Sequence, residues 1–588
     1  MSDTGVPPVM RAHLFTFFLF VATAASPVAS QEPSRLDGAW RGPLDESLIT
    51  ADLERFELSP LGGLVGHGVG WEFWFEQERD LLLRGEPDFP PRAIGENGRY
   101  GRDGWAVSRS EVLLESLPLL VESLESDDPA VREAAVISLG RISYPASEGL
   151  VRGLADDPDP AVRQAVRLAL GMLATDEAVA WLAEEVGDSA APEAERGLAA
   201  LGLGLSGRVR AGTALKLALT ESFSDDAWRE HPGFVQACVL AAGVHGSADF
   251  VRILRRWNAT LGELHDADAV ALRAEVLRAL GALGDERAAP DLLTALGADD
   301  RGVELAAVQA LARLGDTDTV PHLVRFLDGT RDPELRASAL LALGRIGGRQ
   351  AEQALSALRP PRSADLGERT AWHLACGLAR VPDAWEPMRD TMLHGSRTNA
   401  AEDAAPSRDE EVLRGAAAIG LGLFGNPEAM EPLQRALEQE AASPAFRANL
   451  LQAVGLLGGP EAEALLTKTR PEGLRPEERR GLALGLAAVG GDLAAMRLTD
   501  LVLGDEDARV RWAAARGLAS CRSDRALERL VFGLRHDLGQ ESVPARTSHV
   551  LLALGRLGDV HSGSLIGSLV AGGDPAANDP LLAVLRAY

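Results

Sequence analysis

The amino-acid sequence predicts an all-α protein, an α-solenoid (superhelix) of about 13 to 14 stacked two-helix repeats with an irregular N-terminal segment. Two observations carry this prediction. The first is a helix-sized motif, clearest at residues 331–348, that recurs along most of the chain. The second is its spacing, because helix-ending positions recur from residue 143 to residue 558 with a basal step of 31 to 33 residues. Self-similarity at such a period is the sequence signature of a solenoid.

The motif at residues 331–348 contains a start, a buried face and a stop. Asp332 is a good N-cap, and Pro333 suits the first helical position. Apolar residues then recur at helical spacing, which predicts one inward face; they are Leu335, Ala339, Ala342, Leu343 and Ile346. Gly347 and Gly348 end the helix, since glycine enters a left-handed C-terminal cap without strain.

Residues 1–30 are predicted to be an export signal. Basic residues precede an apolar run at 14–25, and small residues precede a cleavage site near Ser30/Gln31. The run is too short to span a bilayer, which takes about 20 residues. We therefore expect an exported protein, periplasmic or extracellular, without a transmembrane anchor.

Residues 31–108 form a Gly- and Trp-rich N-terminal segment that differs from the repeats. Within it, Trp71, Trp74 and Phe75 fall on one face of a predicted helix, and residues 85–104 are rich in Pro and Gly and predicted to be irregular. The aromatic helix is expected to cap the first repeat, because the end of a solenoid must be covered. The alternative is an aromatic partner-binding surface made by these three residues.

Residues 109–588 form the predicted solenoid, and four copies of the motif are especially clear. Each copy has an aspartate followed four residues later by an arginine; the pairs are Asp128 and Arg132, Asp159 and Arg163, Asp332 and Arg336, and Asp507 and Arg511. This pattern resembles HEAT repeats, and the short step resembles the HEAT-like subtype of phycobilisome lyases, an armadillo-type fold. The resemblance implies that the second helices line the concave face, and that these aspartates and arginines form a structural hydrogen-bonded ladder between repeats. At residues 301–308 and 444–450 the Asp-Pro cap is missing, so an interrupted ladder is expected there.

Small residues inside the helices predict close packing. Glycines interrupt the helices at 197–205, 415–423 and 481–490, each at a cost of about 1 kcal/mol relative to alanine, and close backbone approach should offset that cost. The three cysteines, Cys238, Cys376 and Cys521, stand where other copies have alanine or glycine. They are expected to be buried thiols, with no disulfide framework.

Composition and motifs argue against several function classes. The formal net charge is -27, so a nucleic-acid-binding role is not expected. The histidines are scattered, and neither a zinc motif nor a catalytic serine or cysteine motif is present. We therefore expect no catalytic residues, no metal site and no cofactor.

Four stretches lengthen the repeat step and are candidate binding loops. They are residues 220–233, 358–370, 394–411 and 534–546. Insertions in solenoids fall on connecting loops and often flank the binding face. The alternative, to which we give equal weight, is that these loops have no function and vary because loops tolerate insertions and changes of sequence.

The leading functional hypothesis is a non-catalytic scaffold that binds an unidentified protein partner on the concave face. One alternative, suggested by the repeat subtype alone, is a lyase or chaperone for a chromophore or prosthetic group. Another is an envelope structural protein that self-assembles through its ends. Neither the identity of the partner nor the oligomeric state follows from the sequence.

Overall fold

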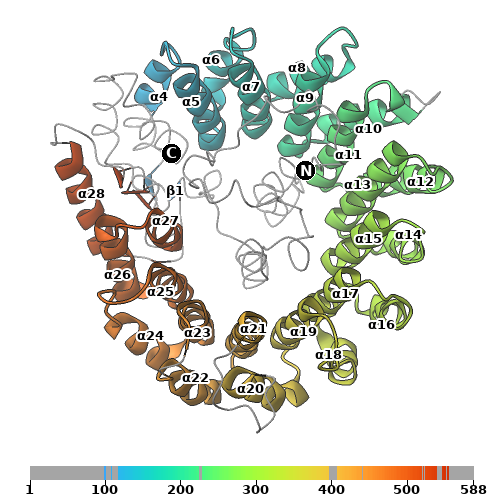
Figure 1. Cartoon of the computed structure of the whole chain (residues 1–588). Helices are drawn as coiled ribbons and strands as arrows, with labels where there is room; N and C mark the ends of the chain where they lie inside the picture. The colour runs from blue at the N-terminus through green and yellow to red at the C-terminus, as the bar shows by residue number, and fades with distance from the viewer. Residues whose placement is uncertain are drawn as a thin grey trace.

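The computed structural model describes residues 99–100, 107–108, 117–223, 228–395, 407–439, 442–518, 521, 523–538, 546–547, 549–550 and 553–554. Over these residues the chain is an α-solenoid whose paired helices follow an arc (Figure 1). One layer of helices lines the hollow side of the arc, and a second layer covers the convex side. The predicted fold class is confirmed.

Each inner helix packs on the next along the arc, so that the inner layer is continuous. These are the second helices of the repeats: α5 (Pro129–Ile142), α7 (Pro160–Leu173), α9 (Glu193–Ser206), α11 (Pro232–His245), α13 (Ala267–Leu283), α15 (Arg301–Leu314), α17 (Pro333–Ile346), α19 (Leu366–Leu378), α21 (Arg408–Phe424), α23 (Pro444–Leu457), α25 (Pro476–Val489) and α27 (Ala508–Gly517).

The outer helices are mostly shorter. They are α4 (Leu117–Ser123), α6 (Glu148–Arg152), α8 (Asp176–Gly187), α10 (Val209–Phe223), α12 (Val251–Leu261), α14 (Ala289–Ala295), α16 (Val320–Gly329), α18 (Gly348–Ala357), α20 (Trp385–His394), α22 (Met430–Leu437), α24 (Gly459–Lys468), α26 (Gly491–Gly504) and α28 (Asp524–Leu538). Several units enter the outer helix through a 3-10 turn: Pro145–Ser147, Ala248–Phe250, Glu286–Ala288, Thr317–Thr319, Pro382–Ala384 and Pro427–Ala429.

A short two-stranded element precedes the solenoid. Strand β1 (Arg99–Tyr100) pairs antiparallel with β2 (Val107–Ser108). The pairing places two residues of extended chain inside the stretch 85–104, which was predicted to be irregular. The predicted aromatic helix with Trp71, Trp74 and Phe75 lies outside the described residues.

The motif at residues 331–348 folds as its sequence predicts. The side chain of Asp332 accepts hydrogen bonds from the backbone N–H groups of Glu334 and Leu335, and α17 ends at the positive-φ residue Gly347. The helix is buried on more than one face, since ten of its residues from Glu334 to Gly344 are shielded from solvent. A repeat inside a stack contacts neighbours on both sides and an outer helix below, which explains why burial exceeds a single stripe.

The predicted stop positions are largely confirmed. Positive-φ glycines end six other inner helices at the expected residue: Gly246, Gly284, Gly315, Gly425, Gly458 and Gly490. Two stops differ from the prediction by several residues. Helix α19 ends at Leu378 rather than near residue 382, and α27 ends at Gly517 rather than near residue 521.

Glycines and alanines bring neighbouring inner helices into backbone contact. A Cβ atom on Gly344 of α17 would lie 2.5 Å from the Cα atom of Ala375 on α19, and one on Gly281 would lie 2.5 Å from the Cα atom of Ala310. Real Cβ atoms essentially never approach so closely. The close approach offsets the unfavourable helix propensity of these glycines.

Replacing Gly344 with alanine is therefore expected to destabilise the protein by about 1–3 kcal/mol, because the added methyl group overpacks the contact between α17 and α19. Gly187→Ala is the matched control. Gly187 lies at the end of α8, and apart from its chain neighbours and the backbone of its own helix no atom stands within 4 Å of the place that its new methyl group would take. The control should be neutral or stabilising by up to about 1 kcal/mol. Urea unfolding of both variants measures the difference, and equal stabilities would contradict the packing role of Gly344.

Three of the four inserted stretches contribute to the structure of the array. In the first, residues 220–233, Trp228 is buried, and Arg229 donates to both carboxylate oxygens of Asp266 at 3.0 and 2.9 Å. In the second, residues 358–370, the buried Glu368 accepts a hydrogen bond from Arg336 at 2.7 Å. In the last, Arg546 pairs with the fully buried Asp537 at the end of α28. Residues 396–406 of the third stretch lie outside the described part of the chain.

Candidate functional site

The inner helices expose one face to the hollow of the arc. On α13, Ala271, Glu275, Arg278 and Ala282 are exposed or half-buried, while the residues between them are mostly buried. Their spacing of four, three and four residues marks one side of the helix. Because the outer layer packs on the opposite side (Figure 1), we call the side formed by such residues the concave face.

Apolar side chains dominate the concave face in the first half of the arc. Half-buried or nearly buried apolar residues occur there on five of the first six inner helices; they are Ile137, Met172, Leu198, Leu205, Leu240, Val244 and Leu305. Gln236 on α11 is exposed beside them. The surface is therefore largely apolar, with few charges between α7 and α11.

Arginines are the main charged residues of the concave face. Arg278, Arg313 and Arg345 occupy it on three consecutive helices, and all three are half-buried. The side chain of Arg278 pairs with Glu275 at 2.6 Å and donates to Gln309 on α15 at 3.4 Å. Glu275 is thus paired with a cation on its own helix, and the arginines outnumber the carboxylates along this stretch.

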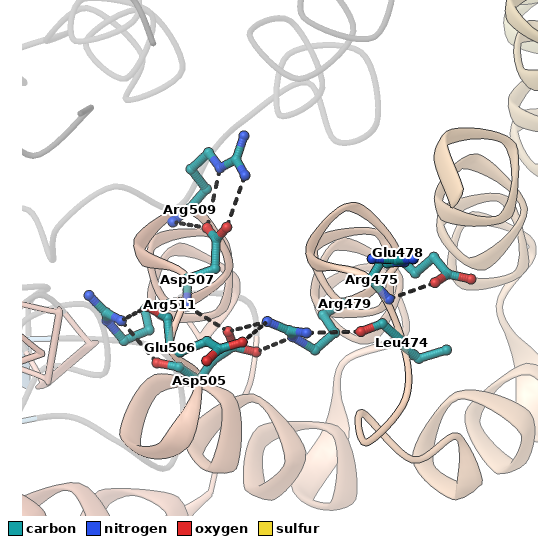
Figure 2. A network of polar contacts seen from close by, with 9 residues as sticks. All are labelled: Leu474, Arg475, Glu478, Arg479, Asp505, Glu506, Asp507, Arg509 and Arg511. Carbon is teal, nitrogen blue, oxygen red and sulfur yellow. Dashed lines mark hydrogen bonds and ion pairs between the residues drawn. The ribbon is translucent and has the colours of Figure 1, made fainter. Parts of the chain in front are cut away.

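A tryptophan and two arginines form the concave face of α27. Arg509, Trp512 and Arg516 recur at helical spacing, and the guanidinium carbon of Arg516 lies 5.3 Å from the centre of the Trp512 ring. Arg509 pairs with Asp507 at 2.9 Å and points away from the outer helices (Figure 2). On the adjacent α25, Arg480 and Leu484 are half-buried on the same face.

A ladder of arginine–carboxylate pairs runs along the edge where the inner helices begin. Arg132 donates to both carboxylate oxygens of Asp157 in the next repeat, at 2.8 Å each. Arg479 bonds Asp505 in the same way, at 2.7 and 3.0 Å, and also the carbonyl oxygen of Leu474 (Figure 2). Such bidentate pairs are the strong class of charge-assisted hydrogen bonds.

In other arginine–carboxylate pairs of the ladder, which we call rungs, the acceptor is a glutamate three residues after the cap of the next inner helix. Arg163 pairs with Glu195 at 2.9 Å, Arg336 with Glu368 at 2.7 Å, and Arg447 with Glu478 at 2.8 Å. The interruption expected at residues 444–450 does not occur, because Arg447 makes its pair there. At residues 301–308 the ladder position, four residues after the cap Asp300, is Glu304 and not an arginine, and Arg301 at the start of α15 pairs with Asp332 at 2.8 Å instead.

The predicted aspartates mostly serve as caps, and other carboxylates accept from the arginines. The Asp159 side chain accepts from the N–H of Ala161, and that of Asp507 accepts from the N–H of Arg509. Asp332 is both a cap and the acceptor for Arg301. The backbone oxygen of Asp128 accepts from the backbone N–H of Arg132 at the start of α5. A sequence signal was available for the glutamate acceptors, since an acid at the third helical position is typical of helix starts. Asp157 and Asp505 lie two residues before the caps Asp159 and Asp507 and have no such signal.

Arg511 differs from the other arginines at the ladder position in the groups that its side chain bonds. Its NH1 group donates to the carbonyl oxygens of Asp505 and Glu506 at 2.9 Å each, and its side chain bonds no carboxylate among the residues that the structure describes. The residue that matches Asp505 in the next repeat is Asp537, and Asp537 is bonded by Arg546 and Thr547. The insertion before Arg546 has therefore changed the partner at this rung.

The ladder makes the acid stability of the protein depend on Asp157. Burial pushes the pKa of this carboxyl up, but hydrogen bonds from Arg132 and from the N–H of Asp159 prevail and hold the pKa below its ordinary value. Its stabilisation is then present above the unfolded pKa of about 3.9 and lost as pH falls through the folded value. Asp157→Asn should flatten the loss of stability below about pH 4 in urea unfolding at several pH values. An acid limb as steep as that of the parent would contradict this assignment.

The three cysteines are buried and free. Burial raises the pKa of the Cys238 thiol to about 12, which leaves almost no reactive thiolate at neutral pH. Across the described residues, no three His, Cys, Asp or Glu side chains are arranged to hold a metal ion. No helix in that same part of the chain is both long and apolar enough to cross a bilayer.

Comparisons with known proteins agree with the architecture. A sequence profile for HEAT repeats matches residues 117–204, 258–344, 292–374 and 398–472, and a profile for the PBS lyase HEAT-like repeat matches residues 510–536. A search of curated protein sequences found no match.

Solved structures with stacked helices are similar at low sequence identity. Importin beta is 14% identical, with a TM-score of 0.36, and the match covers 81% of this chain and 68% of that one. The CpcE and CpcF complex of phycocyanin lyase from Nostoc is 23% identical, with a TM-score of 0.27, and covers 46% of this chain and 93% of that one. Human deoxyhypusine hydroxylase is 19% identical, with a TM-score of 0.22, and the match covers 49% of this chain and 98% of that one.

Proposed function

The chain belongs to the HEAT-like repeat family, and from that premise we propose that it is a non-catalytic scaffold that binds another protein along its concave face. The observation that carries the proposal is the composition of that face. Its inner helices present apolar side chains and arginines to the hollow of the arc, and these residues are typical of the centre of protein interfaces. The arginines and carboxylates of the ladder, in contrast, pair with one another across neighbouring repeats, so their role is structural.

Site-specific photo-crosslinking tests the concave face directly. A photoreactive residue replaces Gln236 or Ala271, which are exposed on the concave face of α11 and α13. Both positions are expected to trap a partner protein. The control is Thr213, which is exposed on the outer helix α10. Trapping of the same partner in equal yield from Thr213 would contradict binding on the concave face.

A second candidate function is a lyase or chaperone for a chromophore or prosthetic group. It is favoured by one observation, the match of residues 510–536 to the PBS lyase HEAT-like repeat. The matched residues include Trp512 and Arg516, which place an aromatic ring and a cation on the concave face. The candidate predicts a visible absorption band that co-purifies with the protein and disappears in Trp512→Ala. A colourless protein that binds no added tetrapyrrole would exclude it.

Export to the periplasm or the exterior is a further part of the proposal. It rests on the signal-like residues 1–30, which lie outside the described residues. Intact-mass measurement of the protein from its native source should give a mature chain that begins near Gln31. A chain that retains residues 1–30 would contradict export by this signal.

A further inference from the structure

A glycine contact is repeated along the inner layer of helices. In nine of the eleven inner helices from α5 to α25, the residue three positions before the first positive-φ residue after the helix is glycine. These glycines are Gly140, Gly171, Gly204, Gly243, Gly281, Gly344, Gly377, Gly422 and Gly455. A Cβ atom on each of them would lie at most 3.2 Å from a backbone atom of the next inner helix. The contact therefore holds consecutive inner helices backbone to backbone.

One joint, as we call the contact between two consecutive inner helices, lacks this glycine. In the joint between α15 and α17, Ala312 occupies the position on α15. The glycines of these two helices do not replace it, because Gly344 faces α19 and no atom of α17 lies within 4 Å of the Cβ position of Gly302. Helix α25 also has an alanine, Ala487, but there Gly517 of α27 provides the close approach. From α5 to α27, α15 and α17 are thus the one consecutive pair of described inner helices without a glycine contact.

The same joint lacks the ladder arginine. Four residues after its cap, α15 carries Glu304. Arg301 bonds Asp332 and Glu334 of α17 instead, with a side chain that is 54% exposed, and an ion pair of such exposure contributes at most about 1 kcal/mol. The other described inner helices without an arginine four residues after the cap, α11, α13 and α21, retain the glycine contact. The joint between α15 and α17 is therefore held by neither of the two repeated contacts.

Like charges face each other across this joint. Burial, together with the negative charges of Asp332, Asp300 and Asp299, raises the pKa of the Glu304 carboxyl. Asp332 is the cap of α17, whereas Glu304 lies in the first turns of α15. When both carboxyls are ionised they repel each other between the two helices, and an arginine at the same place would attract. The joint thus opposes close approach where the rungs of other repeats favour it.

We propose that the joint between α15 and α17 is the hinge of this solenoid, about which helices α4–α15 and helices α17–α28 move as two stiffer arms. The hinge goes beyond the proposed function, since it holds whatever the concave face binds. Six inner helices stand on each side of the joint, and the joint lies far from both ends of the arc at α4 and α28 (Figure 1). Packed helices are about 10 Å apart, so each arm is up to about 50 Å long, and a rotation of about 5° at the joint moves its far end by about 4 Å. The hinge would in this way change the width of the hollow without disturbing either arm.

Distances between two spin labels on the full chain test the hinge. Introduced cysteines carry the labels at exposed positions of the outer helices: Thr294 on α14 and Gln353 on α18 span the hinge, and Gln353 and Glu431 on α22 are the control pair. Each pair spans two joints, and both joints of the control have the glycine contact. The three native cysteines are buried. Pulsed electron paramagnetic resonance on frozen protein should give a distance distribution at least about twofold broader for the hinge pair than for the control pair, and equal widths would overturn the hinge.

Two variants exchange the features of the joints, and thermal unfolding establishes that each is folded. Glu304→Arg supplies the missing arginine and removes a like charge, so it should narrow the distribution of the hinge pair to within about 1.5-fold of the control pair. Gly422→Ala gives α21 the alanine that α15 carries, and it should broaden the distribution of the control pair at least about 1.5-fold. Glu184→Arg, at an exposed position of the outer helix α8, makes the same change of charge and should leave both widths unchanged. Unchanged widths in the folded Glu304→Arg and Gly422→Ala variants would overturn the assignment of the hinge to these contacts.

Discussion

Replacing Arg479 with methionine should lower the free energy of unfolding by about 3–5 kcal/mol, because it leaves a buried carboxylate without its partner. The side chain of Asp505 is 3% exposed and that of Arg479 is 12% exposed, and two hydrogen bonds join them. Methionine retains most of the aliphatic stem. The loss therefore reports the uncompensated charge more than a cavity.

An exposed pair provides the control for Arg479. Arg435 and Glu431 form an ion pair on α22 in which both side chains are more than 60% exposed, and Arg435→Met should cost at most about 1 kcal/mol. Urea unfolding, followed by circular dichroism, compares the two variants. A cost below about 1 kcal/mol for Arg479→Met would mean that the ladder contributes little to stability.

Replacing Leu343 with alanine should cost about 2–5 kcal/mol, because the residue is fully buried in α17 and its truncation leaves a cavity. Coupling in a solenoid acts between neighbouring repeats. The damage should thus be concentrated in α15, α17 and α19, and unfolding should lose its single transition. Hydrogen exchange resolved along the chain measures this distribution.

The control for Leu343 is a leucine that packs on the outside. Leu217 on α10 is 58% exposed, and Leu217→Ala should change stability by less than about 0.5 kcal/mol. Faster exchange spread evenly over the whole array in Leu343→Ala would contradict nearest-neighbour coupling. An unchanged exchange pattern would show that the residue does not anchor α17.

Local sequence rules predicted most of the repeat structure. Asp332 and Gly347 begin and end α17 as expected, because capping and positive φ depend on a few adjacent residues. The early end of α19 at Leu378 was not predicted. There Arg380 adopts the left-handed conformation instead of a glycine, and an arginine in that conformation has no characteristic sequence signal.

Partners across repeats were harder to predict than the repeats themselves. Three arginines of the ladder were predicted, namely Arg132, Arg163 and Arg336, whereas Arg447 and Arg479 were not. The acceptors were assigned to the capping aspartates. Those aspartates lie within reach of their own backbone N–H groups, which compete for the same oxygens. Glu195, Glu368 and Glu478 stand one helical turn further on and remain available. The composition of the concave face was not predicted, because it depends on which side of each helix faces the hollow.

The backbone contacts at Gly281 and Gly344 also bear on how the arc is sized. Glycine and alanine let inner helices approach more closely than larger side chains would allow. The hollow side of the array is then shorter than the convex side, and this difference sets the radius of curvature. Exchanging glycine for alanine, or alanine for serine, at one such contact would open the arc by a small angle while the exposed side chains stayed unchanged. If the proposed scaffold function holds, such exchanges would fit the span of the arc to a partner of another size without altering the residues of the concave face.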